Sequence, residues 1–207
     1  IKRVKKVKLA LAVIGLFALA CIAGGALIGM PPFGFVVLAV FVGVPTTLVA
    51  LKMRESSLSS SKLISAFFVA TVVTMSVIQF IPYGKDHTNP PVNGEPAWSS
   101  SRTRELMVRA CFGCHSNSVE YPSYASVAPI SWVVQSHIDE GREKVNYQEW
   151  NTRQRKADDT IEVIKEGEMP PGYYTMFGKH PEAKLTEAEI SELVAGLLLT
   201  PGFNDHD

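Results

Sequence analysis

The sequence has no net charge and few cysteines. It contains 207 residues, with 20 Lys and Arg against 20 Asp and Glu, and three cysteines. A zero balance excludes a nucleic-acid-binding protein that relies on bulk positive charge, and it excludes a highly charged disordered chain. The sequence also lacks a Ser–His–acid arrangement, a Gly-rich phosphate loop and an HExxH motif. We therefore expect neither an enzyme nor a nucleic-acid partner.

Acidic residues are almost absent from the first 83 residues. This part holds 8 Lys and Arg and a single acid, Glu55, whereas residues 84–207 hold 12 Lys and Arg and 19 acids. The net charges are +7 and −7, respectively. The neutral composition is thus the sum of two segments with opposite charge, and we consider them separately.

Three uncharged runs occupy the N-terminal segment. They are Leu9–Met30, Phe33–Leu51 and Leu63–Pro82, of 22, 19 and 20 residues. A bilayer core requires about 20 apolar residues of helix, so each run is long enough to span a membrane. The alternative for the first run is a signal peptide that is cleaved before Cys21. However, the apolar run continues past Cys21 to Met30, which favours a membrane span. The sequence predicts a three-span transmembrane anchor at residues 1–83.

Basic residues flank these runs unevenly. They lie in residues 2–8 and 52–62, whereas the link at Pro31–Pro32 is uncharged. The positive-inside rule then predicts a multi-pass protein of the bacterial cytoplasmic membrane with a cytoplasmic N-terminus. Everything after Pro82 is predicted to lie on the outer, periplasmic side. The predicted partners are the lipid bilayer and other membrane subunits. Small residues in the first run would allow a helix of another subunit to approach closely.

The rest of the chain is predicted to be an all-α domain after a linker. Residues 84–98 are rich in Pro, Gly and Asn and predict an extended, Pro-rich connector. Four helices are predicted within residues 99–207. The first begins after the Ser99–Ser101 cluster and the second after Pro129. The third covers residues 157–167 with Gly167 as its cap, and the fourth begins at a Thr186–Glu189 capping box. No alternating strand pattern is present.

The motif that indicates chemistry is Cys-Phe-Gly-Cys-His at residues 111–115. C-x-x-C-H is the attachment motif of a c-type haem. Two cysteines on one helical turn can each form a thioether to the haem, and the adjacent histidine can reach the iron. A redox dithiol requires a surrounding βαβ pattern, and a structural zinc site requires a second Cys/His pair. The sequence predicts one covalently attached haem c, bound by Cys111 and Cys114, with His115 as the proximal iron ligand.

The distal iron ligand has several candidates. Met169 is favoured because it precedes Pro170–Pro171, a stiff segment, and because it lies 54 residues after His115, which leaves enough chain to pass round the haem. Met176, His137 and His180 are alternatives, and an open sixth position is another. His–Met ligation raises the reduction potential relative to bis-histidine ligation.

Several segments together resemble a known family. They are CFGCHSN (111–117), YPSY (121–124), APISWVVQSHIDEGREKVNYQEW (128–150), GEMPPGYY (167–174) and HPEAKLT (180–186). The chain is similar over about Phe80 to Leu199 to the bacterial haem-binding domain family, whose members are small membrane-attached monohaem c-type cytochromes. The resemblance implies a small cytochrome c-like helical haem domain in which Cys111, Cys114 and His115 hold the haem. It also implies a distal-ligand region at Met169–Pro171.

Together these observations predict a membrane-anchored monohaem cytochrome c that carries single electrons. We expect it to be a subunit of a larger respiratory or photosynthetic electron-transfer complex. Its acidic outer domain favours a redox partner with a basic patch. The alternative is a haem-based sensor or ligand-binding subunit with an open or labile sixth iron position.

Overall fold

The protein is helical wherever its structure is described. The computed structural model describes residues 2–44, 46–47, 51 and 60–203, and no strand occurs within them. The all-α prediction is therefore confirmed for this part of the chain. The α-helices are α1 (Lys2–Leu27), α2 (Pro32–Leu38), α4 (Ser60–Ile78), α5 (Ser101–Ala110), α6 (Phe112–His115), α7 (Ile130–Lys144), α8 (Thr160–Lys165), α9 (Gly172–Thr175) and α10 (Glu187–Leu198). A π-helix, η1 (Ala39–Gly43), follows α2, and the 3₁₀ turns are η2 (Ser123–Ser126), η3 (Met176–Gly178) and η4 (Pro181–Ala183).

The chain forms two compact units. The N-terminal unit comprises Ile1–Lys85 and Tyr124–Val133, and the C-terminal unit comprises Asp86–Ser123 and Val134–Asp207. The short segment Tyr124–Val133 is held in the N-terminal unit by Gln79. Its amide Nε2 donates to the carbonyl of Ala128 at 2.8 Å, and its Oε1 accepts from the Ala128 N–H at 3.0 Å. The unit therefore combines two parts of the chain that are distant in sequence.

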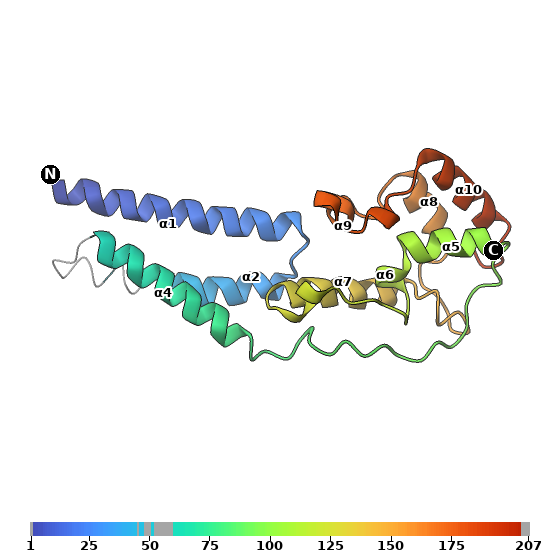
Figure 1. Ribbon diagram of the computed structural model, residues 1–207, viewed down its shortest axis with the longest axis horizontal. Coiled ribbons are helices and arrows are strands. Elements are labelled where there is room, and N and C mark those ends of the chain that lie inside the picture. The colour runs from blue at the N-terminus through green and yellow to red at the C-terminus, as the bar shows by residue number, and fades with distance from the viewer. Residues whose placement is uncertain (1, 45, 48–50, 52–59, 204–207) are drawn as a thin grey trace. The chain divides into compact units, whose positions relative to one another are not determined.

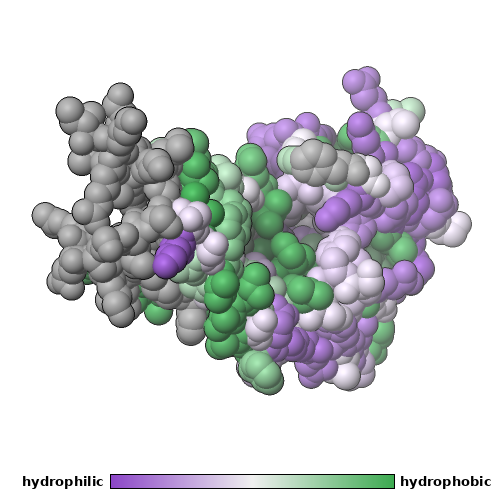
Figure 2. Space-filling model, turned by 60° about the vertical axis from the view of Figure 1, so that its left-hand side comes forward, coloured by the Kyte–Doolittle hydropathy of each residue, from purple (hydrophilic) through white to green (hydrophobic). Residues whose placement is uncertain are grey.

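The N-terminal unit is built on α1 and α4, which run alongside each other (Figure 1). The ring of Phe17 meets that of Phe67 edge to face at a centroid distance of 5.7 Å, and Phe67 is buried. Trp132 is fully buried and packs with Ile78 and Phe33. Many other large apolar side chains in residues 13–80 are exposed, and Figure 2 shows a band of hydrophobic residues on the face in view. Among the described side chains of this unit, more large apolar ones are exposed than are buried in its core.

The predicted three-span anchor is not supported. Within the part of the chain that the structure describes, no helix combines the length and the apolar composition needed to cross a bilayer. The sequence prediction treated each uncharged run as one continuous helix. Instead, α1 begins with five basic residues in Lys2–Lys8 and ends at Leu27, before the first run ends. Residues 33–43 of the second run are divided between α2 and η1, and α4 ends at Ile78, four residues before Pro82. The prediction of three membrane-spanning helices was therefore wrong.

The predicted location depended on those spans. A multi-pass protein of the bacterial cytoplasmic membrane, with a cytoplasmic N-terminus and a periplasmic haem domain, is contradicted by the same finding. The basic segment at 52–62, predicted to be a cytoplasmic loop, lies for the most part outside the described residues.

The C-terminal unit packs α5, α8 and α10 around one aromatic-rich core (Figure 1). Leu106, Leu193 and Leu197 are almost completely buried where α5 meets α10. The two helices approach closely because position 196 is glycine, and a Cβ there would overlap the Thr103 side chain. A layer of rings completes the core, formed by Trp98, Phe112, Tyr147, Trp150 and Phe203.

The helix caps predicted from sequence are present. The Ser100 side chain accepts a hydrogen bond from the Thr103 N–H at the start of α5. At the start of α10, Thr186 and Glu189 form the predicted capping box, in which each side chain accepts from the backbone N–H of the other residue. These bonds satisfy N–H groups that have no partner within the helix.

The predicted linker is extended but firmly attached. The Glu95 carboxylate accepts two hydrogen bonds from Arg104, at 2.6 and 2.8 Å, and further ones from Trp98 Nε1 and Gln148 Nε2. The hydrogen bonds from Arg104 are the main cause that lowers the Glu95 pKa to about 2. Glu95 is therefore ionised at neutral pH, and it fastens the extended segment to α5.

Candidate functional site

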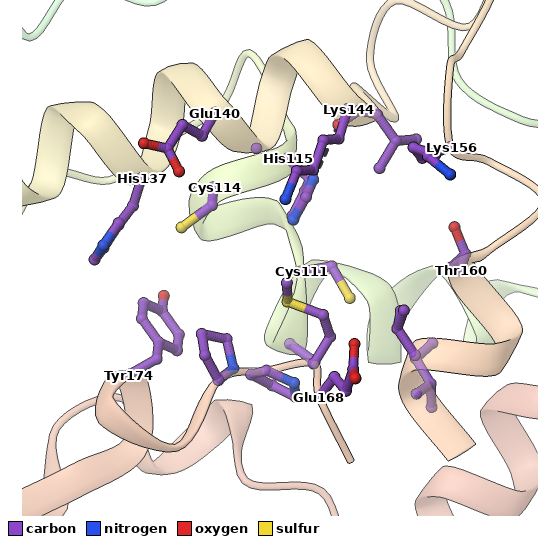
Figure 3. Close-up of a pocket in the computed structure, with 18 of the residues that line it drawn as sticks. Cys111, Cys114, His115, His137, Glu140, Lys144, Lys156, Thr160, Glu168 and Tyr174 are labelled. Carbon is purple, nitrogen blue, oxygen red and sulfur yellow. Dashed lines mark hydrogen bonds between the residues drawn. The ribbon is translucent and has the colours of Figure 1, made fainter. Parts of the chain in front are cut away.

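A cavity of about 380 Å³ opens in the C-terminal unit. It lies between the Cys111–His115 turn, the C-terminal half of α7, α8 and residues 168–174 (Figure 3). Its volume falls within the range of small-molecule sites. Cys111, Cys114 and His115 all line it, as do Tyr147, Val163 and Pro170. The three residues of the sequence motif thus share one cavity.

The local backbone turns both thiols toward this cavity. α5 ends at Ala110, and Cys111 has a non-helical conformation with φ of −120°. The N–H groups of Cys114 and His115 then donate to the Cys111 carbonyl at 3.2 and 3.0 Å. Cys111 to His115 therefore form a separate turn, with both cysteines present as free thiols.

The His115 ring is held through one of its nitrogens. Nδ1 lies 3.0 Å from the Val145 carbonyl oxygen, which can only accept, so Nδ1 carries the proton. Burial lowers the pKa of His115, so that the ring is neutral at neutral pH. A neutral imidazole that donates Nδ1–H to a carbonyl leaves Nε2 as a metal ligand, as in most protein metal sites.

Both thiols are neutral in this environment. Burial raises the pKa of Cys111 to about 12 and that of Cys114 to about 11. Reactive dithiols and thiolate metal ligands instead have lowered pKa values. Uncharged sulfur suits the apolar cavity, as a thioether would.

Glycine at position 141 allows α7 to lie against the Cys111–His115 turn. A Cβ atom there would come within 2.8 Å of the Cys114 carbonyl oxygen. Gly113, between the two cysteines, is similarly covered by the hydroxyl of Tyr174. The turn is therefore enclosed from two sides, by α7 and by the segment that contains Tyr174.

The end of α8 brings Met169 to the cavity. Gly167 has φ of +72°, and its N–H donates to the Ile164 carbonyl at 3.2 Å. The Glu168 N–H donates to the Val163 carbonyl at 2.9 Å, which completes a Schellman motif. Gly167 is thus the helix cap that the sequence predicts. The chain reverses at this cap, and Met169 lines the cavity directly after it.

The other candidates for the distal ligand differ in position. His137 also lines the cavity, and its ring stacks on Tyr173 at a centroid distance of 4.8 Å. Met176 and His180 are not among the residues that line it. The His180 ring stacks on Tyr174 at 4.1 Å, and Nδ1 lies 3.3 Å from a Glu182 carboxylate oxygen. The identity of the distal ligand remains a prediction, with Met169 and His137 in the cavity.

A buried polar network next to the motif was not predicted from the sequence. Asn117 donates its N–H to Gln148 Oε1 at 3.0 Å and accepts from Asn146 Nδ2 at 2.7 Å. All three side chains are buried. The Tyr147 N–H, in the same segment, donates to the His115 carbonyl at 2.9 Å. Asn and Gln in a loop give no sequence signal, because exposed loops have the same composition.

These features fit a haem. The cavity offers two neutral thiols one turn apart, an imidazole whose Nδ1 is fixed, and a methionine thioether from another segment. Its walls include aromatic and aliphatic side chains. Within the described residues, no three His, Cys, Asp or Glu side chains are grouped so that they could hold a metal ion by themselves.

A comparison with protein families agrees with this geometry. The family model described as "Haem-binding domain" matches residues 73–198, more than half of the chain. The match includes every residue that lines the cavity. No curated protein and no solved structure is significantly similar to the chain.

The contact at Gly141 predicts the effect of a substitution. Gly141→Ala places a methyl group against the Cys114 carbonyl, which must separate α7 from the turn. We expect the free energy of unfolding to fall by about 1–3 kcal/mol and the yield of haem-containing protein to fall with it. Gly172→Ala is the matched control, because a Cβ there meets no atom within 4 Å. Urea denaturation and haem absorbance measure both effects, and equal behaviour of the two variants would contradict the packing argument.

Proposed function

The chain belongs to the haem-binding domain family, and on that basis we propose that it carries single electrons on one covalently attached c-type haem. In this proposal Cys111 and Cys114 would hold the haem through thioethers, and His115 Nε2 and Met169 would be the iron ligands. The observation that carries the proposal is the arrangement around His115. Two thiols from its own helical turn face the same cavity, while the Val145 carbonyl holds Nδ1.

Attachment requires no oxidant or reductant. Cys111 and Cys114 would each add across one vinyl group of the haem, forming a sulfur–carbon bond while the thiol hydrogen passes to the neighbouring vinyl carbon. The S–H bond and the π bond are lost, and no electrons are gained or removed. Both sulfurs remain uncharged, which suits sites where burial keeps the pKa of Cys111 and Cys114 high.

The protein's own part in electron transfer is to hold the ligands and exclude water. When bound, the haem iron supplies the one-electron chemistry by alternating between the ferrous and ferric states. Tyr147 and Val163 line the cavity, and Tyr147 is almost fully buried. A methionine ligand raises the reduction potential relative to a second histidine, which suits an electron acceptor. The proposal needs no acid–base residue, and we propose a carrier, not an enzyme.

The charge of the surrounding chain indicates the type of redox partner. Residues 84–207 contain 19 acids against 12 Lys and Arg, and three acids line the cavity itself, at Glu140, Asp159 and Glu168. A partner with a basic patch would be attracted to this surface. We therefore propose a partner with a basic patch for electron transfer.

The covalent attachment is tested by cysteine variants. The wild-type polypeptide should keep its haem after denaturation, because thioether bonds survive unfolding. Cys111→Ala and Cys114→Ala should each leave one bond, and the double variant should lose covalent haem. Mass spectrometry of the denatured chain measures this. Cys21→Ala is the control, because Cys21 is exposed and does not line the cavity. A wild-type chain that releases its haem on denaturation would refute the covalent proposal.

The distal ligand is tested with carbon monoxide. Wild-type ferrous protein should be low-spin and should not bind carbon monoxide, because both axial positions are filled. Met169→Ala should open one position and bind carbon monoxide rapidly, whereas Met176→Ala should behave like the wild type. Visible absorption spectra distinguish these states. Rapid binding to the wild type would favour a sensor or ligand-binding role over an electron carrier.

The electrostatic attraction is tested with two small oxidants of opposite charge. The reduced protein should transfer electrons to a cationic cobalt complex more slowly as ionic strength rises, by about tenfold or more. The rate with anionic ferricyanide should instead rise, because salt screens repulsion. Stopped-flow absorbance at the haem bands measures both rates. Rates that do not depend on salt with either oxidant would remove the case for a basic partner.

A further inference from the structure

Two lysines line the cavity and lie next to each other. Lys144 is the last residue of α7, and Lys156 lies in the turn region before α8. The backbone N–H of Lys156 donates to the Lys144 carbonyl at 3.1 Å, which fixes the two residues side by side. In Figure 3 Lys144 and Lys156 lie on one side of His115 and His137 lies on the other, with Cys111 and Cys114 between His137 and Lys156. Both lysines form part of the cavity wall, and the C-x-x-C-H motif did not predict that they would.

Of the three acidic residues that line the cavity, only Asp159 is ion-paired with one of these lysines. Glu140 lies one turn before Lys144 on α7, and its Oε1 accepts a hydrogen bond from Ser136 Oγ at 3.0 Å. Glu168 directly precedes Met169. Asp159 is the acid beside the lysines, with its Oδ2 2.6 Å from Lys156 Nζ. This end of the cavity therefore carries two lysine ammonium groups and one carboxylate, that of Asp159.

A haem brings two propionate carboxylates into such a cavity. These carboxylates lie on the edge of the ring away from the vinyl groups that the cysteines use. A carboxylate near an apolar site is costly unless it is paired, and a lysine ammonium is a compact charge with three donors. We propose that Lys144 and Lys156 bind the two haem propionates. This inference rests on the proposed function, since it concerns the same haem.

The pairing has a consequence for the iron. An ammonium group near the ring favours the form with less positive charge, which is the ferrous form. The lysines would therefore raise the reduction potential as well as orient the ring. Lys156 is already paired with Asp159, so a propionate would share or replace that carboxylate.

The test uses the full chain with its haem attached. Lys144→Gln, Lys156→Gln and the double variant should each retain covalent haem but shift the midpoint potential downward, most in the double variant. The propionate bending bands in the resonance Raman spectrum should shift as well. Spectroelectrochemical titration measures the potential, and denaturing mass spectrometry confirms attachment.

Arg155→Gln is the matched control. It removes one positive charge next to Lys156, but Arg155 pairs with Glu143 at 2.7 Å and does not line the cavity. Its side chain is 69% exposed, against 57% for Lys156, so the control differs from Lys156 mainly because it lies outside the cavity. We expect a smaller shift in potential and unchanged propionate bands. Lysine variants that match Arg155→Gln in both measurements would overturn the proposal.

A second pair of variants covers the case in which the glutamine variants fail to fold. Lys144→Arg and Lys156→Arg keep the charge and should keep the potential close to that of the wild type. If the arginine variants lowered the midpoint potential as much as is expected from the loss of a charge, the proposed pairing of the lysines with the propionates would be overturned. Wild-type protein without covalent haem would refute the proposed function instead, so the two failures are distinguishable.

Discussion

The site depends on the close approach of α7 to the Cys111–His115 turn. This approach is possible because residue 141 has no side chain, so the helix backbone can lie against the Cys114 carbonyl. The same approach positions the last turn of α7 and the residue after it. Arg142 Nε donates to the Ser116 carbonyl at 2.8 Å, and the Val145 carbonyl receives the His115 Nδ1–H. One helix thus supports the turn, fixes the histidine tautomer and places Lys144 at the cavity.

The segment after α7 secures the same turn through hydrogen bonds. Asn146 Nδ2 donates to Asn117 Oδ1, the Asn117 N–H donates to Gln148 Oε1, and Gln148 Nε2 donates to the Glu95 carboxylate. Buried polar groups are costly when unpaired, so a fully bonded network of this kind favours one arrangement of its loops. The extended segment predicted to be a linker therefore helps to hold the site in place, because its Glu95 bonds to Arg104 on α5.

The sequence correctly predicted those helix caps in which the hydrogen-bonding residues lie close together along the chain. The Thr186–Glu189 capping box and the Gly167 cap involve residues within five positions of one another, and local backbone chemistry decides them. The membrane prediction failed because an uncharged run was taken for an uninterrupted helix. Residues 33–43 of the second run are divided between α2 and η1, and no helix among the described residues meets the requirements of a span.

The sequence by itself determined which potential haem-binding groups share one turn of the candidate site. C-x-x-C-H requires only that two thiols and an imidazole share one turn, and the spacing of residues 111–115 ensures that. The tertiary structure alone decided which distant residues meet this turn. It brings Met169, His137, Lys144 and Lys156 to the cavity and leaves Met176 and His180 outside. The physical reason is that their positions depend on how α7 and α8 pack, which no local propensity of the intervening residues specifies.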